Sequence, residues 1–197
     1  DAQPGLPDRD ALLAALPRRL DEARARGHSL AVILLGLDGF KSVNSTAGHA
    51  AGDALLNVAG LRIASCVRKD GLAARLGGDE FAVVAGPLES EALALATAKR
   101  VLGCFREPFR VSGETRRLGA SIGVAVFPGD GQDARELVKN AGLALLRAKH
   151  HGRGRIEMFT QELDAHFRER MALERDLHEA VQERRFQVHY QPIVDAG

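Results

Sequence analysis

Residues 72–85 read LAARLGGDEFAVVA, and the interpretation of the fold depends on this stretch. Two short apolar runs, 72–76 and 81–85, are separated by two glycines and two carboxylates. Glycine accepts the positive φ of a tight turn, so the pattern predicts a β-hairpin with residues 77–80 at its tip. The glycines would let a nucleotide approach the backbone, and the carboxylates could hold a divalent metal. For these four residues alone, an ordinary solvated turn is an equally good interpretation.

The segments around this hairpin alternate between strand-like and helical patterns. Two long apolar runs, 29–37 (SLAVILLGL) and 118–127 (LGASIGVAVF), have the length and composition of buried central strands. Apolar residues at helical spacing predict helices at 8–27, 50–67, 89–105 and 133–149, and a short strand follows at 156–159. Asp8 and Asp133 are the expected N-caps of the first and the last of these helices. Strands alternating with helices, plus one hairpin, predict an α/β fold with a mixed central sheet flanked by helices.

Length, composition and charge describe a globular chain with one main domain. The 197 residues suffice for one well-packed domain and an appendage. A content of 45% hydrophobic and 27% charged residues excludes a disordered or fibrous chain. The net charge of +1 provides no strong field, so neither nucleic acid nor an anionic membrane is expected as a partner.

The cysteines and the apolar runs indicate in which cellular compartment the chain is expected. Cys66 and Cys104 lie inside apolar helical patterns, where unpaired buried thiols are more common than a disulfide or a metal site. Such thiols favour a reducing cytoplasm. The longest apolar run, 30–35, is far too short to span a bilayer, although a longer parent protein could be anchored to the inner membrane.

The pattern changes after residue 160. Residues 160–183 are rich in Glu and Arg and carry one apolar stripe, which predicts a helix long enough to connect the domain 1–159 to another domain. Residues 184–197 include the strand-like run FQVHYQPIV, which then stops without a partner.

Several segments together resemble one family. Residues 77–81 spell GGDEF, preceded by Arg75 and Leu76, and this resembles the signature of diguanylate cyclases, which condense two GTP molecules into cyclic di-GMP. Residues 1–9 (DAQPGLPDR) are similar to the entry motif of these GGDEF domains, and 37–53 (LDGFKSVNSTAGHAAGD) is similar to their guanine-recognition segment. The resemblance implies a fold related to nucleotidyl cyclases and polymerase palm domains.

The resemblance also implies roles for individual residues. Asp79 and Glu80 correspond to catalytic positions, and the implied nucleotide-binding residues are Asn44, His49, Asp53, Gly78, Lys149 and Arg153. Asn44 and Asp53 suit guanine because an amide both donates and accepts, while a carboxylate accepts from the N1 and N2 hydrogens. Lys149 and Arg153 correspond to the cations that bind the triphosphate, and their four-residue spacing would place them on one side of a helix end. In isolation, Asn44 would be interpreted as a helix cap, and the two cations as a solvated helix terminus.

One metal ligand of the family is missing from this sequence. Active members carry an aspartate eight residues before the guanine-binding asparagine, and here that position is Gly36. Condensation of this kind needs two metal ions, Mg²⁺ or Mn²⁺, to activate the attacking hydroxyl and to neutralise the leaving pyrophosphate. Asp79 remains as a ligand, and Asp38 could partly substitute because strand periodicity puts it on the same side as residue 36. The shift along the strand is about 7 Å, so we expect a weakened metal site.

Other positions depart from the family as well. Ser45 replaces an aspartate, and Gly142 and Leu146 replace an aspartate and a tyrosine of the last helix. The family's product-inhibition site pairs an arginine with an aspartate three residues later; Arg68 is present, but its partner position is Gly71. We therefore expect weak or no feedback binding of cyclic di-GMP at a degenerate site around Arg68.

Residues 184–195 (RRFQVHYQPIVD) look like the start of an EAL domain, the phosphodiesterase fold that hydrolyses cyclic di-GMP. The catalytic residues of that fold are absent here, so this chain is expected to lack phosphodiesterase activity. Three hypotheses follow: a GTP-binding GGDEF domain that is impaired as a cyclase and regulates the downstream EAL domain, an active cyclase using Asp38 and Asp79, or a nucleotide-free interaction module. The active cyclase would have to dimerise, because each subunit presents one GTP to the other.

Overall fold

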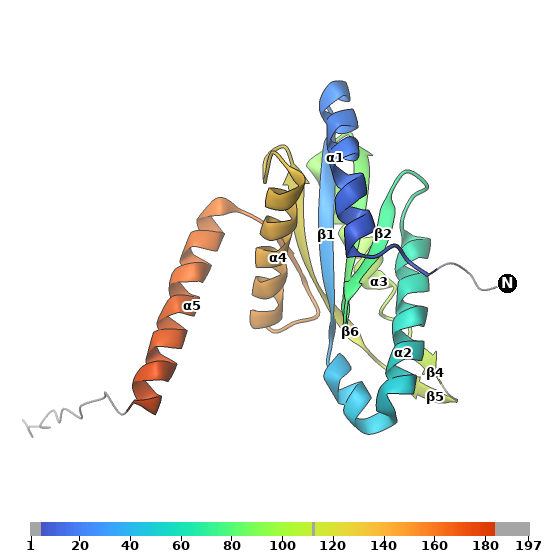
Figure 1. Ribbon diagram of the computed structural model, residues 1–197, viewed down its shortest axis with the longest axis vertical. Coiled ribbons are helices and arrows are strands. Elements are labelled where there is room, and N and C mark those ends of the chain that lie inside the picture. Colours follow the sequence, from blue (N-terminus) through green and yellow to red (C-terminus); the bar gives the residue numbers. More distant parts are fainter. Residues whose placement is uncertain (1–4, 112, 184–197) are drawn as a thin grey trace, which may run out of the picture. The chain divides into compact units, whose positions relative to one another are not determined.

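The computed structural model describes residues 5–111 and 113–183, and the chain divides into two units, 1–161 and 162–197 (Figure 1). The first unit contains a mixed sheet with helices on both faces, as the sequence predicted. The described part of the second unit is almost entirely the helix α5 (Gln161–Gln182), at the place of the expected connector helix. No helix among the described residues combines the length and apolar character that a membrane span requires.

The sheet has five strands in the order β2-β3-β1-β6-β7. Their bounds are β1 (Ser29–Asp38), β2 (Leu72–Gly77), β3 (Glu80–Leu88), β6 (Gly119–Phe127) and β7 (Ile156–Met158). β1 lies in the centre, antiparallel to both β3 and β6, and β7 is parallel to β6. The apolar run predicted as a central strand is buried on both faces because helices cover both sides of it.

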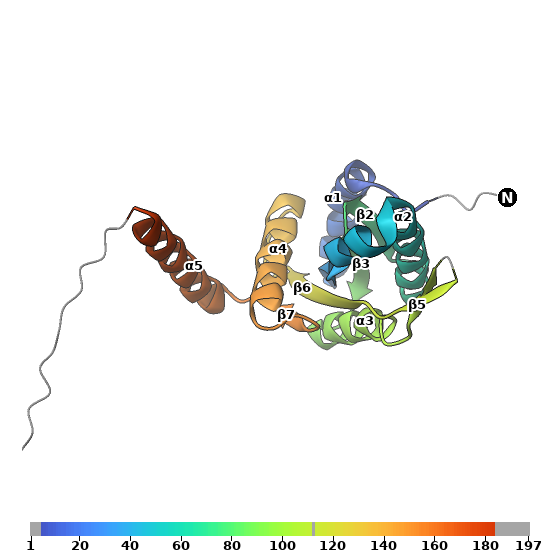
Figure 2. The same ribbon diagram turned by 90° about the horizontal axis from the view of Figure 1, so that it is seen from below.

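Two layers of helices enclose the sheet, and Figure 2 shows α3 and α4 on opposite sides of the strands. The helices are α1 (Arg9–Arg26), α2 (Phe40–Cys66), α3 (Glu91–Gly103) and α4 (Ala134–His150). Odd-numbered β1 residues such as Ile33 pack with α2 and α3, and even-numbered ones such as Val32 pack with α1 and α4. Asp8 and Asp133 cap α1 and α4 as predicted, because each side chain accepts a hydrogen bond from a backbone N–H in the first turn.

Helix α4 lies unusually close to the sheet at one point. A Cβ added to Gly123 of β6 would lie 2.1 Å from the backbone nitrogen of Leu145 and 2.2 Å from the carbonyl oxygen of Ala141. Only glycine permits this approach, since a side chain would push the helix backbone outwards. The contact sets how closely α4 approaches β6, the neighbour of β1, and with it the position of Lys149 near the helix end.

Two features of the first unit differ from the prediction. Helix α2 starts at Phe40, ten residues before the expected start, and contains a kink at Gly48, whose φ of 81° and ψ of 165° are not helical. The sequence analysis also missed a small hairpin formed by β4 (Phe109–Val111) and β5 (Glu114–Arg116). Its strands are only three residues long, too short for an alternating pattern to stand out.

Both cysteines are free, as predicted, but they are half-buried rather than fully buried. Burial, reinforced by the neighbouring Cys66, raises the pKa of the Cys104 thiol to about 12. The Cys104 thiol therefore stays protonated at physiological pH, where only the thiolate is a good nucleophile.

Candidate functional site

The hairpin tip at residues 77–80 is held in place by its own backbone, by Arg75 and by β1. Gly77 pairs with Glu80, and the turn between them has positive φ at Gly77 (130°) and Gly78 (52°). Arg75 donates from Nη2 to the carbonyl oxygen of Gly78 at 2.9 Å. The carbonyl of Asp79 accepts from the N–H of Leu37 at 3.1 Å, which ties the tip to the end of β1. The predicted hairpin with its glycine turn is therefore confirmed.

Gly36 lies at the centre of the candidate site. In the sheet it is directly opposite Glu80 on one side and Ser121 on the other. Its missing side chain leaves a space that Lys149 of α4 fills: a Cβ at position 36 would lie 2.6 Å from both Cε and Nζ of Lys149. The Lys149 ammonium also lies 3.5 Å from Oε1 of Glu80. The structure thus brings Gly36, Glu80 and Lys149 together.

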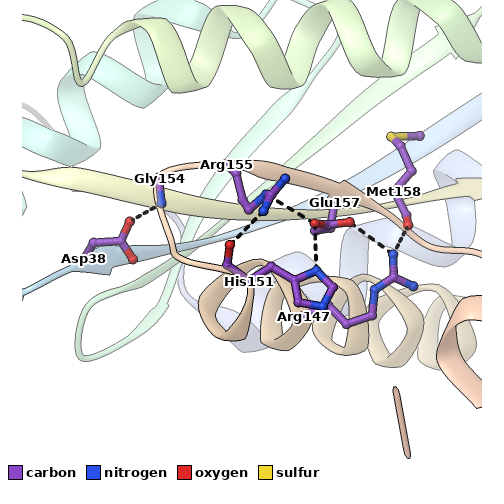
Figure 3. A network of polar contacts seen from close by, with 7 residues as sticks. All are labelled: Asp38, Arg147, His151, Gly154, Arg155, Glu157 and Met158. Carbon is purple, nitrogen blue, oxygen red and sulfur yellow. Dashed lines mark hydrogen bonds and ion pairs between the residues drawn. The ribbon is translucent and has the colours of Figure 1, made fainter. Parts of the chain in front are cut away.

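Asp38 lies on the same face of the sheet as Gly36, as strand periodicity predicted, but its carboxylate has other partners. Oδ1 accepts from the hydroxyl of Ser121 at 2.8 Å, and Oδ2 accepts from the backbone N–H of Gly154 at 2.9 Å. Ser121 is fully buried. Asp38 therefore fastens the loop between α4 and β7 to the end of the sheet (Figure 3).

The predicted guanine-binding residues sit on either side of the kink in α2. Oδ1 of Asn44 is buried and has no hydrogen-bond partner among the described residues. It packs directly over Gly52, where an added Cβ would lie only 1.9 Å away, so the two halves of α2 meet at this point. Asp53 and His49 are exposed on the second half. A buried acceptor without a partner is unfavourable unless a ligand donates to it, and the N1–H or N2–H of guanine could do so.

The loop after α4 carries the second predicted cation. Arg153 lies beyond the end of α4 at His150, so the helical spacing that was expected to align it with Lys149 does not apply. Its φ of 61° is the one positive value among the described residues that are not glycine. Its backbone N–H donates to the carbonyl of Ala148 at 3.1 Å. A backbone held in this uncommon conformation indicates a loop that the surrounding contacts determine strongly.

Those surrounding contacts centre on Glu157 of β7 (Figure 3). Its carboxylate lies 3.2 Å from Nη2 of Arg147, 3.3 Å from Nδ1 of His151 and 3.3 Å from Nε of Arg155. The Arg147 side chain is only 3% exposed and that of Glu157 17%, so this ion pair is largely removed from water. Arg155 also donates to the carbonyl of His151 at 2.7 Å, which closes the loop on itself. The network ties the end of α4 and the loop after it to β7, and Lys149 and Arg153 belong to these segments.

Glu157→Ala is expected to lower the free energy of unfolding by about 3 kcal/mol, because it leaves a buried guanidinium without its carboxylate. Burial alone would raise the pKa of Glu157, but hydrogen bonds from His151 and Arg147 and the charges of Arg147 and Arg155 outweigh it and lower the pKa below its ordinary 4.5. At a pH above the ordinary pKa, the ionised Glu157 contributes fully to the free energy of unfolding. This contribution is lost as the pH falls through the lowered pKa of the folded state.

Urea titrations of the wild type and the variant at neutral and acidic pH measure this difference. Asp21→Ala is the matched control, because Asp21 pairs with Arg24 in an exposed ion pair at 2.9 Å and should contribute less than about 1 kcal/mol. Equal losses of stability in the two variants would show that the Glu157 network contributes no more than a surface ion pair.

The residues present do not form a good divalent-metal site. Residue 36 has no carboxylate, the hydrogen bonds of Asp38 hold its side chain against Ser121 and the loop before β7, and Glu80 has an ammonium at 3.5 Å. No group of three or more potential metal-ligating side chains is found within the described parts of the chain. The divalent ion that the family resemblance implies would therefore find Glu80 already paired with an ammonium and no carboxylate at residue 36.

The predicted degenerate inhibitory site shows a steric difference. A Cβ at Gly71 would lie 2.4 Å from Cγ1 of Val67 and 3.0 Å from the carbonyl oxygen of Val84, so an aspartate does not fit here without a shift. Arg68 lines a small cavity together with Asp70 and Arg100. The side chain that would complete the family's arginine and aspartate pair is thus replaced by close packing.

Sequence reasoning did not identify Ser121 or Glu157 as functional. Ser121 belongs to the SIGV segment that already matched the family, and its polar hydroxyl inside an apolar run was the available signal. Glu157 gave no such signal, because a glutamate in a short strand is usually solvent-exposed. Both residues act by fixing other groups: Ser121 donates to Asp38, and Glu157 pairs with Arg147.

Comparison with known proteins agrees with this geometry. The family model described as "Diguanylate cyclase, GGDEF domain" matches residues 1–155. The chain is 37% identical over 194 residues to the cyclic di-GMP phosphodiesterase NbdA of Pseudomonas aeruginosa, covering 98% of this chain and 25% of NbdA. It is 38% identical over 189 residues to MucR of the same organism, a bifunctional diguanylate cyclase/cyclic di-GMP phosphodiesterase, covering 96% of this chain and 27% of MucR. The chain thus spans about a quarter of the length of these curated relatives.

A solved structure supports the fold. The GGDEF domain of TpbB (YfiN) from Pseudomonas aeruginosa superposes with a TM-score of 0.82 at 35% sequence identity, covering 86% of this chain and 98% of that one. The family match, the shared fold and the glycine-tipped hairpin beside the end of β1 together show that this chain belongs to the GGDEF domain family of cyclic di-GMP signalling.

Proposed function

We propose that this GGDEF domain binds GTP, is impaired as a diguanylate cyclase, and regulates an EAL phosphodiesterase domain that follows it in the parent protein. One observation carries the proposal: the space of the missing carboxylate at Gly36 is filled by the ammonium of Lys149. Without that carboxylate, the metal ions that activate the attacking hydroxyl lose a ligand, while the contacts to base and phosphates remain.

Three features support retained nucleotide binding. The unpaired Oδ1 of Asn44 faces the second half of α2, next to the exposed Asp53. Lys149 and Arg153 lie on the end of α4 and the loop after it, which the Glu157 network ties to β7. GGDEF domains as a family bind GTP and cyclic di-GMP and often form dimers. GTP binding and the condensation of two GTP molecules have different requirements, so GTP binding can persist when condensation is weakened.

The downstream partner is inferred from the end of the sequence and from the relatives. Residues 184–195 resemble the start of an EAL domain, and they lie outside the described residues. NbdA is named a cyclic di-GMP phosphodiesterase, and MucR is named a bifunctional diguanylate cyclase and cyclic di-GMP phosphodiesterase. We infer that GTP shifts the connector helix 160–183 between two arrangements and so changes the activity of the phosphodiesterase domain. This requires that the two arrangements bind GTP with different affinities.

Calorimetry and product analysis test the proposal on the same protein sample. GTP is titrated in Mg²⁺ buffer, and micromolar protein is then incubated with GTP and analysed by chromatography for cyclic di-GMP. We expect binding with little or no product. Formation of cyclic di-GMP at ordinary rates would instead support an active cyclase, and absence of binding would support a nucleotide-free interaction module.

The active cyclase would use Asp38 and Asp79 as metal ligands and would require a homodimer. The hydrogen bonds from Ser121 and Gly154 hold the Asp38 carboxylate two residues along the strand from position 36, a shift of about 7 Å. Mg²⁺ demands near-ideal octahedral geometry at about 2.1 Å, so a carboxylate displaced this far is a poor substitute, which is why we favour the impaired domain.

A further inference from the structure

We propose that the ammonium of Lys149 is the built-in cation of this nucleotide site, so that GTP binds here without a divalent metal. The proposal rests on the GTP binding proposed above and specifies which ion offsets the charge of the triphosphate. It arises from a difference between this chain and its family: residue 36 provides no carboxylate, and a protein cation occupies the same small volume.

Glycine at position 36 creates the room for this cation. With any other residue, the Cβ would approach Cε and Nζ of Lys149 to 2.6 Å, so the flexible end of the lysine would have to leave this position. The next atom, Cδ1 of Leu145, is 4.0 Å away. The end of the lysine side chain therefore occupies the volume into which the missing aspartate would project.

The charges around Lys149 agree with its role as a cation in the site. Its ammonium pairs with Glu80 at 3.5 Å, and Glu80 is directly opposite Gly36 in the sheet. A divalent ion bound by Glu80 would have to share the space with the ammonium, and like charges at contact distance repel each other. Lys149 is also in the last turn of α4, where the helix dipole favours a positive charge.

The ammonium remains accessible to a ligand. The Lys149 side chain is 30% exposed and the Glu80 side chain 49%, so the pair borders on solvent. An ammonium has three donors and suits phosphate oxygens, and its pairing with one carboxylate leaves donors available. Arg153 belongs to the loop that begins after α4, so a second cation is close in the chain. The two cations together offset part of the triphosphate charge.

The experiment measures GTP binding by calorimetry in EDTA and in excess Mg²⁺. For the wild type we expect dissociation constants within about threefold of each other, because the protein cation is always present. Lys149→Met should weaken binding in EDTA by about 10- to 100-fold, the range of a lost hydrogen bond between charged groups. Mg²⁺ should then restore part of this loss, since the space beside Glu80 becomes free.

Lys139→Met is the matched control, because Lys139 is an exposed lysine on the same helix, more than two turns before Lys149. Thermal unfolding of each variant checks that it is folded. Binding that requires Mg²⁺ in the wild type overturns the inference and leaves the proposed function intact. An equal loss for Lys149→Met with and without Mg²⁺ also overturns it, since the lysine would then only contact phosphate. No binding under either condition overturns the proposed function itself.

Discussion

Gly36→Asp is expected to raise the affinity of the site for Mg²⁺ by at least about tenfold, because even outer-shell changes alter metal affinity 10- to 100-fold. The new carboxylate would sit opposite Glu80, beside Leu37, which is hydrogen-bonded to the backbone carbonyl of Asp79, and it would form an ion pair with the Lys149 ammonium or displace it. The displaced group is the end of a flexible side chain, so its movement should cost little. GTP binding should become sensitive to EDTA, and part of the synthesis of cyclic di-GMP should return.

Gly36→Ala is the control for this prediction. Its methyl group forces the same movement of Lys149 but brings no metal ligand, so it should not increase Mg²⁺ affinity. Calorimetry with Mg²⁺ and GTP and chromatography of the product compare the three proteins. If the aspartate variant binds Mg²⁺ and GTP no better than the wild type, the missing ligand at residue 36 is not the defect.

Gly123→Ala should be among the most destabilising single changes in the domain. Its methyl group would lie 2.1 Å from the backbone nitrogen of Leu145 and 2.2 Å from the carbonyl oxygen of Ala141, and neither atom can move without the helix. We expect a loss of about 3 kcal/mol or more, since overpacking against rigid backbone exceeds the usual range of 1–3 kcal/mol. That loss corresponds to a fall of roughly 10 °C in Tm for a domain of this size.

Gly142→Ala is the control: it makes the same glycine-to-alanine change at a position where the added methyl group meets no backbone atom. Gly142 lies in α4, and its added Cβ would meet only Cδ1 of Leu34, at 3.9 Å. The change should stabilise the protein by up to about 1 kcal/mol through helix propensity. Calorimetric unfolding of both variants provides the comparison, and a Gly123→Ala protein as stable as the wild type would show that α4 can shift at no cost.

The local pattern of the sequence was sufficient to predict most of the helices and strands. The glycine-tipped hairpin at 72–85, the two central strands and the capping residues Asp8 and Asp133 were predicted where the structure has them. Periodicity and turn chemistry act over a few residues, so they can be recognised without a fold. The early start of α2 was missed because Gly48 looks like a helix end, although the chain continues through a kink there.

The sequence by itself determined that residue 36 is a glycine where the family carries a carboxylate, and that the hairpin beside it retains Asp79 and Glu80. Only the tertiary structure decided what fills the resulting space, and how Asp38 is used. The register of β3 and β6 against β1 brings Glu80 and Ser121 beside Gly36, and the close contact at Gly123 lowers α4 until Lys149 reaches the same point. These side chains are far apart in the sequence, so their contacts depend on how the elements pack rather than on local pattern.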